Sequence, residues 1–270
     1  MAYTLDYSGC AVCVVGGTSG IGLGVAETFA RAGARVAVLG RDPQKLRAAR
    51  AKLGASAAGR AVDVRDAAAV ADAFAALGQE LGPLDVVVSA AAGNFPARAI
   101  DMTARAFKAV IDIDLLGSFH VAQAAYAALR RPSGSLIHIS APQAILAMAL
   151  QSHVCAAKAG VDMLTRTLAL EWAAEGLRVN SIVPGPIEGT EGMARLAPGP
   201  EAMERVRASV PLGRLGAADE IGRAALWLAS AQAAYVTGVV LPVDGGWSLG
   251  GAAQLAETMA AGVRESGKTP

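Results

Sequence analysis

Cysteine, aromatic residues and charged residues are all scarce in this chain of 270 residues. The three cysteines, Cys10, Cys13 and Cys155, form neither a CxxC pair nor a disulfide framework, so we expect reduced, mostly buried thiols. Aromatic residues make up only 4% of the chain, so alanine and branched aliphatic side chains must fill the core. Such side chains suit helices that pack on a sheet.

The charge pattern and the hydropathy pattern exclude several classes of protein. The formal net charge is only +1, and no basic run is interleaved with aromatic residues, so a nucleic-acid partner is not expected. No apolar run reaches the roughly 18 residues that a membrane span needs. Residues 1–9 do not resemble a secretion signal, and residues 266–270 are not a peroxisomal address. We therefore expect a cytoplasmic protein.

Short apolar runs alternate with long alanine-rich stretches along the chain. The runs are continuously apolar, as in parallel strands that are covered on both faces. The pattern predicts a single doubly wound, Rossmann-type α/β sheet of about seven parallel strands with helices on both faces. The predicted strands cover residues 11–15, 35–39, 61–64, 84–89, 135–140, 178–183 and 239–243. The predicted helices cover residues 21–32, 43–53, 67–81, 103–129, 152–175 and 218–229.

No break in composition divides the chain, so we expect one dinucleotide-binding and catalytic domain over residues 1–270. Residues 184–216 are rich in proline and glycine and follow a predicted strand. Ligands of such sheets bind beyond the carboxyl ends of the strands, so this loop is expected to be a substrate lid. A surface loop without a role is the alternative. Residues after 247 form a C-terminal extension, either a helix over the substrate site or a partly disordered tail.

A glycine-rich loop follows the first predicted strand and precedes the first predicted helix. Its glycines permit a tight turn and let the backbone approach a pyrophosphate, and the helix N-terminus supplies N–H groups and partial positive charge. A turn without a ligand is the alternative, but the position of the loop between strand and helix argues against it. The predicted cofactor contacts in this loop are Gly16, Thr18, Ser19, Gly20, Ile21 and Gly22.

The residues after the second predicted strand indicate which dinucleotide binds. An acidic residue there would hydrogen-bond the ribose of NAD, but the chain has Gly40 followed by Arg41. A guanidinium pairs well with a 2′-phosphate, so NADP(H) is favoured. The alternative is an arginine that only faces solvent. Asp63 and Val64, which end the third predicted strand, are expected at the adenine unless Asp63 is an ordinary surface residue.

Together with Ala91-Ala92-Gly93, Lys158 and Pro184-Gly185, the glycine-rich loop resembles the short-chain dehydrogenase/reductase family. The resemblance extends from Ala11 to Trp247. It implies a homodimer or homotetramer joined through the lysine helix and the C-terminal strand. It also implies further cofactor contacts, with Thr190 as an additional candidate in a loop that has one extra residue. These contacts are Ala91, Gly93, Lys158, Pro184, Gly185 and Ile187.

The chain departs from the family at two catalytic positions. Ketone-reducing members carry a tyrosine four residues before the lysine and a serine about thirteen residues before that tyrosine. Here those positions hold Val154 and Ala141, and neither side chain can donate a proton. Carbonyl reduction leaves an alkoxide that needs an adjacent acid. Ordinary ketone or alcohol chemistry is therefore disfavoured.

Within the family, the chain is most similar to the peroxisomal type of 2,4-dienoyl-CoA reductase, which departs in the same way. The similar runs are residues 91–95, 112–114 and 184–192, and His153 also fits. The resemblance implies that Asp114 and Lys158 form the catalytic pair. It also suggests that Asn94, Phe95 and His153 lie near the substrate, although His153 is at least as plausible as a buried supporting residue. For Asp114 the alternative is a carboxylate that faces solvent from a helix.

The chemistry of a dienoyl thioester agrees with these replacements. Hydride addition at the far end of the conjugated system places negative charge on the thioester oxygen, remote from the attacked carbon. Hydrogen-bond donors for that oxygen and a proton source near the α-carbon are then needed, rather than a phenol beside the hydride. Arg98, Arg105, Lys108 and Arg195 are candidate contacts for the phosphates of CoA.

The leading hypothesis is NADPH-dependent reduction of a 2,4-dienoyl-CoA to a 3-enoyl-CoA in the oxidation of unsaturated fatty acids. A second hypothesis is reduction of another conjugated enoyl or enone compound, or of a β-ketoacyl thioester. A third is a catalytically silent NADP(H)-binding regulatory paralogue. No metal site is expected, since His120 and His138 have no partners at a ligand spacing.

Overall fold

Seven parallel strands form one sheet in the computed structural model, which describes residues 5–250. Their order is β3-β2-β1-β4-β5-β6-β7, so the winding reverses between β1 and β4. In such sheets the ligand crevice lies at this reversal, beyond the carboxyl ends of the strands. The strands are β1 (Ala11–Val15), β2 (Arg35–Gly40), β3 (Ala58–Ala61), β4 (Val86–Ser89), β5 (Ser135–Ile139), β6 (Arg178–Pro184) and β7 (Val240–Val243).

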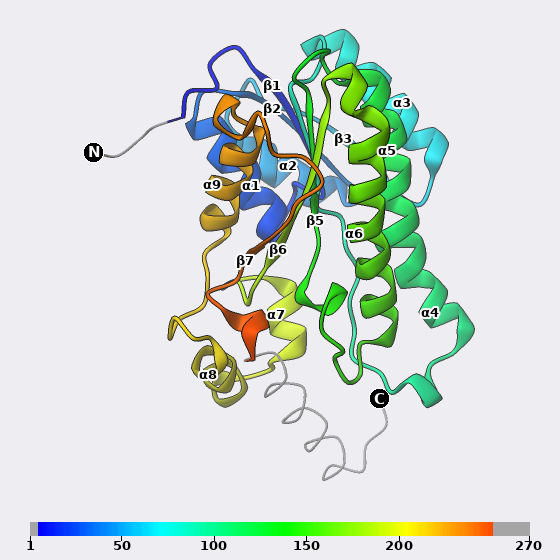
Figure 1. The fold of residues 1–270 in the computed structure, drawn as a ribbon, viewed down its shortest axis with the longest axis vertical. Coiled ribbons are helices and arrows are strands. Elements are labelled where there is room, and N and C mark those ends of the chain that lie inside the picture. The colour runs from blue at the N-terminus through cyan, green and yellow to red at the C-terminus, as the bar shows by residue number, and fades with distance from the viewer. Residues whose placement is uncertain (1–4, 251–270) are drawn as a thin grey trace.

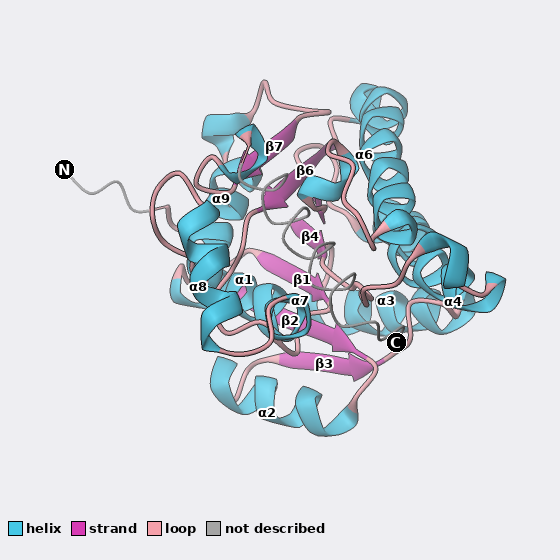
Figure 2. Cartoon of the chain, turned by 90° about the horizontal axis from the view of Figure 1, so that it is seen from below, coloured by secondary structure: helices cyan, strands magenta, loops and turns pink. Residues whose placement is uncertain are grey.

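Helices cover both faces of the sheet, as Figure 1 shows. On one face lie α1 (Gly20–Arg31), α2 (Pro43–Leu53) and α9 (Ala218–Ala229), and on the other lie α3 (Ala67–Leu81), α5 (Gly117–Ala128) and α6 (Ser152–Trp172). The remaining helices are α4 (Ala104–Val110), α7 (Glu191–Leu196) and α8 (Pro200–Ser209). Figure 2 looks at the molecule from the end at which α7 and α8 lie.

The sequence of β1 shows why the sheet is covered on both faces. Ala11, Cys13 and Val15 pack into the core beneath α3, α5 and α6. Val12 and Val14 point the other way, into the core beneath α1, α2 and α9. Alternate residues of a strand face opposite sides, so a strand with two cores needs apolar residues at every position. The continuous apolar runs of the sequence follow from this arrangement.

The predicted fold class is confirmed, and the bounds of α2, α3 and α9 agree with the predicted helices. Residues 61–64 were expected to form the third strand, and that prediction is wrong, since β3 covers Ala58–Ala61. Pairing decides its position, because Ala37 to Gly40 of β2 lie opposite Ala58 to Ala61. A Cβ at Gly59 would come within 2.8 Å of the Val38 carbonyl oxygen, so the close contact with β2 favours glycine at this position. Glycine is a weak strand former, which is why the sequence pattern did not indicate a strand here.

Two further segments differ from the sequence prediction. The continuous helix expected over residues 103–129 is divided by a π-helical turn, Ile111–Leu116, between α4 and α5. Such turns insert a residue into a helix and change which side chains face the core. The loop expected over residues 184–216 contains α7 and α8. The C-terminal extension expected after residue 247 lies almost entirely outside the described residues.

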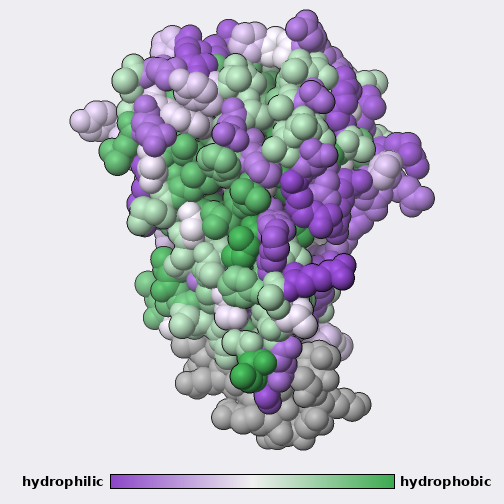
Figure 3. All heavy atoms as spheres, turned by 90° about the vertical axis from the view of Figure 1, so that its right-hand side faces the viewer, coloured by the Kyte–Doolittle hydropathy of each residue, from purple (hydrophilic) through white to green (hydrophobic). Residues whose placement is uncertain are grey.

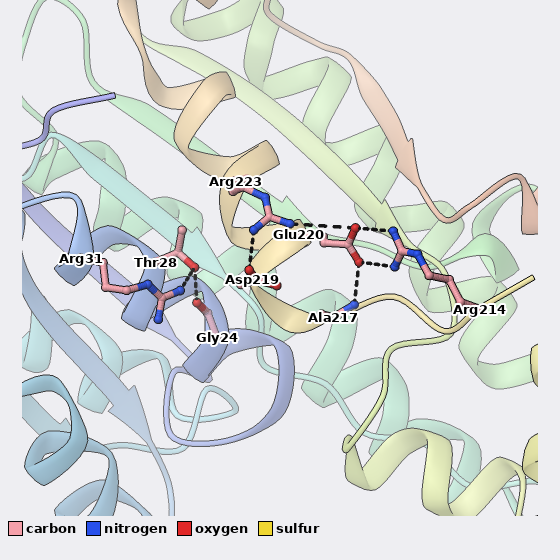
Figure 4. Close-up of polar contacts among 8 residues, drawn as sticks. All are labelled: Gly24, Thr28, Arg31, Arg214, Ala217, Asp219, Glu220 and Arg223. Carbon is pink, nitrogen blue, oxygen red and sulfur yellow. Dashed lines mark hydrogen bonds and ion pairs between the residues drawn. The ribbon is translucent and has the colours of Figure 1, made fainter. Parts of the chain in front are cut away.

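The segment between α8 and α9 is bound to the N-terminus of α9, and α9 in turn packs on α1 (Figure 4). The two helices approach closely because a Cβ at Gly24 would collide with Ala218 and one at Gly222 would collide with Thr28. At the N-terminus of α9, Glu220 accepts two hydrogen bonds of 2.7 Å from Arg214 and one of 2.9 Å from the backbone N–H of Ala217. Glu220 therefore ties the loop to the first turn of α9.

This contact predicts a pH-dependent contribution to stability. The Arg214 guanidinium, and next the Ala217 N–H, lower the pKa of Glu220 from 4.5 to about 2. A carboxylate with a lowered pKa stabilises the fold above its unfolded pKa, and this stability is lost as the pH falls toward the folded pKa. We expect Glu220→Gln to reduce the free energy of unfolding by about 1 kcal/mol at pH 7, a value reduced for solvent screening.

Urea unfolding of both proteins between pH 7 and pH 3 measures the effect. The difference in the free energy of unfolding should be constant above pH 5 and shrink as the pH falls below about 4.5. A difference that does not change with pH would show that the charge on Glu220 contributes nothing.

Candidate functional site

A cavity of about 450 Å³ opens at the carboxyl ends of β1 and β4, where the winding of the sheet reverses. The glycine-rich loop, the end of β2 and the loop after β4 form much of its wall. The π-helical turn contributes Asp114, α6 contributes Lys158, and α7 with the residue before it contributes residues 190–192 and Arg195. Residues after β3 and at the end of β5 complete the wall, so the cavity brings together residues from eight parts of the chain.

The glycine-rich loop forms a cradle that only glycine can shape. Gly16 has φ +79°, and a Cβ there would come within 2.6 Å of the Ala91 nitrogen. A Cβ at Gly22 would collide with the carbonyl of Gly16. Ser19, the N-cap of α1, makes no side-chain hydrogen bond to the helix, so the first N–H groups of α1 are left for an anion. All six loop residues predicted from the sequence line the cavity.

The end of β2 leaves no room for the acidic side chain that would hold the ribose of NAD. A Cβ at Gly40 would come within 2.6 Å of the Thr18 hydroxyl oxygen. Arg41 follows, exposed, and lines the cavity. Asp42 also lines it, but its carboxylate accepts the N–H groups of Gln44 at 2.7 Å and Lys45 at 3.2 Å, which lower its pKa. The acid next to Arg41 therefore serves to cap α2.

Asp63 and Val64 also line the cavity, although they follow β3 rather than end it. Asp63 forms an ion pair of 2.6 Å with Arg65, and this contact lowers the pKa of Asp63. The backbone carbonyl of Val64 lies 2.8 Å from Nδ1 of His120. Each of the two residues is thus held at the cavity wall by one neighbouring side chain.

Asp114 and Lys158 form a buried ion pair in the wall of the cavity. Lys158 Nζ lies 3.4 Å from Asp114 Oδ2, and the side chains are only 5% and 1% exposed. Lys158 also donates a hydrogen bond of 3.0 Å to the Ile139 carbonyl. The N–H of Gly93 donates to Asp114 Oδ1 at 2.6 Å. The alternative of a solvent-facing Asp114 is wrong.

The π-helical turn explains how two nearby acids receive different surroundings. Asp112 is paired with Lys108 at 2.6 Å, and Lys108 is 71% exposed. Asp114, two residues later, points inward to Lys158. The sequence indicated that both acids cannot face one way. The structure shows which of the two faces the cavity.

The wall near Lys158 has no proton-donating side chain at positions 154 and 141. Val154 and Ala141 both line the cavity, and neither has a polar side-chain atom. Ser140, which directly follows β5, and Gln143 also line the cavity, and sequence reasoning missed both. The signal that could have identified Ser140 is its place at the carboxyl end of a predicted strand, next to Ala141, which the sequence had already singled out.

Several predicted contacts lie away from this wall. Pro184 ends β6, and Gly185 and Ile187 line a second cavity, of about 490 Å³, between β7 and α9. Gly185 has a structural reason to be glycine, since a Cβ there would come within 2.7 Å of Asp244. Ala91, Gly93, Asn94 and Thr190 do line the main cavity. For Pro184, Gly185 and Ile187, contact with a cofactor remains a prediction.

Phe95 and His153 pack on each other beside the cavity rather than on its wall. Their ring centroids are 4.4 Å apart, and His153 is fully buried. Among the described residues neither ring nitrogen of His153 has a hydrogen-bond partner. Burial lowers the pKa of His153, which favours the neutral imidazole. Contact of these two side chains with a substrate remains a prediction.

The cations expected at the phosphates of CoA are mostly engaged. Arg98 pairs with Asp101 at 2.7 Å, Lys108 pairs with Asp112, and Arg195 pairs with Glu191 at 3.1 Å. Exposed ion pairs contribute little free energy, so breaking one costs little. These cations can therefore still bind another anion.

Residues 15–248 match a family model described as enoyl-(acyl carrier protein) reductase. The peroxisomal 2,4-dienoyl-CoA reductase [(3E)-enoyl-CoA-producing] of Mus musculus is 42% identical over 238 residues, which cover 86% of this chain and 82% of that protein. A short chain dehydrogenase from Bacillus anthracis superposes with a TM-score of 0.82 at 37% identity, covering 88% and 96% of the two chains. A variant of the actinorhodin polyketide ketoreductase, with NADPH, superposes with a TM-score of 0.84 at 30% identity, covering 92% and 99%.

The name of the mouse protein includes a peroxisomal location, so it lends no support to the expectation of a cytoplasmic protein. Within residues 5–250 no helix has both the length and the apolar character to cross a bilayer. The same residues contain no group of three or more His, Cys, Asp or Glu side chains placed to hold a metal ion.

Proposed function

The chain belongs to the short-chain dehydrogenase/reductase family and is an oxidoreductase with a nicotinamide cofactor, and on this premise we propose that it reduces 2,4-dienoyl-CoA thioesters to 3-enoyl-CoA with NADPH. The observation that carries the proposal is the buried Asp114–Lys158 pair in a cavity whose usual proton-donating positions hold Val154 and Ala141. The similarity to the mouse 2,4-dienoyl-CoA reductase supports the choice of substrate.

The proposed reaction places charge where this site has polar groups. When bound, the reduced nicotinamide supplies a hydride to the δ-carbon of the dienoyl group. The electron pair of the 4,5-double bond shifts toward the carbonyl, and the thioester oxygen carries the negative charge. A proton from solvent then reaches the α-carbon, which leaves a double bond between the β- and γ-carbons. No proton is required at the attacked carbon, so Val154 and Ala141 are compatible with turnover.

The residues of the site have distinct roles in this proposal. Lys158, with Nζ held by the Ile139 carbonyl, binds the nicotinamide ribose and contributes positive charge to the anionic product of hydride addition. Asp114, fixed by the Gly93 N–H, orients Lys158 and a water that delivers the proton. Asn94 lines the cavity, and in this proposal its side chain contacts the acyl group.

The proposed preference for NADP(H) follows from the end of β2. The space beside Gly40 is filled by Thr18, so an acid for the ribose of NAD does not fit. Arg41 is exposed at the same wall and can pair with a 2′-phosphate.

We propose one catalytic domain in which α7 and α8 act as a lid on the substrate. We also propose that the chain forms a homodimer or homotetramer. Figure 3 shows apolar side chains gathered among hydrophilic ones on the side of the molecule that carries α5 and α6. Phe119 of α5 and Met163 and Leu170 of α6 are exposed, and Leu170 is 83% exposed. A second copy that packs on this face would bury these side chains.

The substrate proposal predicts a clear selectivity. The purified protein should oxidise NADPH, followed at 340 nm, when a 2,4-dienoyl-CoA is added, at least about 100-fold faster than with acetoacetyl-CoA, because the missing acid costs carbonyl reduction that much or more. Mass spectrometry of the product should give a 3-enoyl-CoA. Turnover of acetoacetyl-CoA alone would refute the proposal. Turnover of neither substrate would favour a silent NADP(H)-binding paralogue.

A further inference from the structure

A chain of charged contacts links three parts of the cavity wall. Lys45 of α2 forms an ion pair with Glu191, the first residue of α7. Glu191 Oε2 lies 3.1 Å from Arg195 Nη2, and Arg195 Nη1 lies 3.4 Å from the carbonyl oxygen of Asn94. All four residues line the cavity. These contacts join α2 and α7 to the loop after β4.

Lys45 lies at the end of the cavity where the 2′-phosphate of NADP(H) is expected. It follows Arg41 by four residues, and both line the cavity. Asp42, between them, is held in its capping hydrogen bonds, one of which comes from the N–H of Lys45. Lys45 and Arg41 are therefore two cations on one wall.

Glu191 is the anion that meets these cations. Its carboxylate touches Lys45 and Arg195, and the pKa of Glu191 is lowered chiefly by Lys45, then by Arg195 and Arg41. A carboxylate among three cations marks a position that favours negative charge. The side chains of Lys45 and Glu191 are 43% and 57% exposed, so solvent reaches this contact and another anion can replace the carboxylate.

We propose that the Glu191 carboxylate occupies the position of the 2′-phosphate, beside Arg41 and Lys45, until NADP(H) displaces it. The inference rests on the proposed use of NADP(H). It assigns Glu191 as an internal competitor of the phosphate. Since Glu191 begins α7, binding of NADP(H) but not of NAD(H) would release α7 from α2.

The direct test is titration calorimetry of the full-length protein with NADP⁺ and NAD⁺, which needs no acyl substrate. Glu191→Gln removes the competing charge and should lower the Kd of NADP⁺ about fivefold, the upper end of what an exposed pair contributes. The Kd of NAD⁺ should stay within about twofold. Glu204→Gln is the matched control, because Glu204 pairs with Arg207 at 2.7 Å on α8 and does not line the cavity.

A second variant tests the role of Lys45. Lys45→Met should raise the Kd of NADP⁺ about tenfold through loss of a charged phosphate contact, with the Kd of NAD⁺ unchanged. In the double variant the Glu191→Gln substitution should bring little or no gain, because the competition requires Lys45.

The wild-type affinities separate the two possible failures. Tighter binding of NAD⁺ than of NADP⁺ by the wild-type protein would refute the proposed cofactor, and this inference with it. Tighter binding of NADP⁺ that does not improve in Glu191→Gln, or that improves equally for NAD⁺, would overturn the competitor role alone.

Discussion

Replacing Asp114 by asparagine should lower the turnover of a 2,4-dienoyl-CoA by about 1000-fold, within the range for loss of a proton-transferring group. The amide keeps an oxygen for the Gly93 N–H, which now donates to Asp114 at 2.6 Å, so the loop after β4 stays in place. The negative charge beside Lys158 is lost, and with it the group that orients the ammonium and the proton-delivering water. The Kd of NADPH, measured by fluorescence titration, should change by less than about twofold.

Asp112→Asn is the matched control for this substitution. Asp112 lies two residues away in the same π-helical turn, but it pairs with the exposed Lys108 and does not line the cavity. Its turnover should stay within about twofold of the wild-type value, since an exposed pair contributes little. Equal turnover numbers for wild type and Asp114→Asn would remove Asp114 from the mechanism.

Replacing Lys158 by methionine should both abolish turnover and destabilise the fold. Lys158 and Asp114 are almost completely buried, so the substitution leaves a buried carboxylate without its partner. Removal of one member of such a pair typically costs about 3–5 kcal/mol of unfolding free energy. Urea unfolding should show a loss of this size, and the turnover number should fall by about 1000-fold or more.

The double variant Asp114→Asn, Lys158→Met separates stability from catalysis. With both charges gone, at least half of the lost unfolding free energy should return, while turnover stays absent. Lys108→Met is the control, because it breaks the equivalent exposed pair and should cost less than about 1 kcal/mol. A Lys158→Met protein as stable as the control would contradict the buried-pair argument.

Much of the cofactor site was predictable from the sequence because its contacts are local. Gly16 to Gly22 lie between a strand and a helix that adjoin them in the chain, so the spacing of glycines already describes the turn. Arg41 directly follows β2 for the same reason. The position of β3 was not predictable, because residues 61–64 are more apolar than Ala58–Ala61 and only pairing with β2 selects the latter.

The sequence by itself determined the fold class, the dinucleotide cradle and the absence of a side-chain acid at Val154 and Ala141. These features depend on residue type and on short-range spacing, and both can be read from the sequence without knowledge of the tertiary structure. Tertiary structure alone decided that Asp114, and not Asp112, meets Lys158, because a π-helical turn sets which acid faces inward. It also placed Glu191 against Lys45, which is 146 positions away in the chain. Contacts across such separations depend on how the layers pack, and no local pattern encodes them.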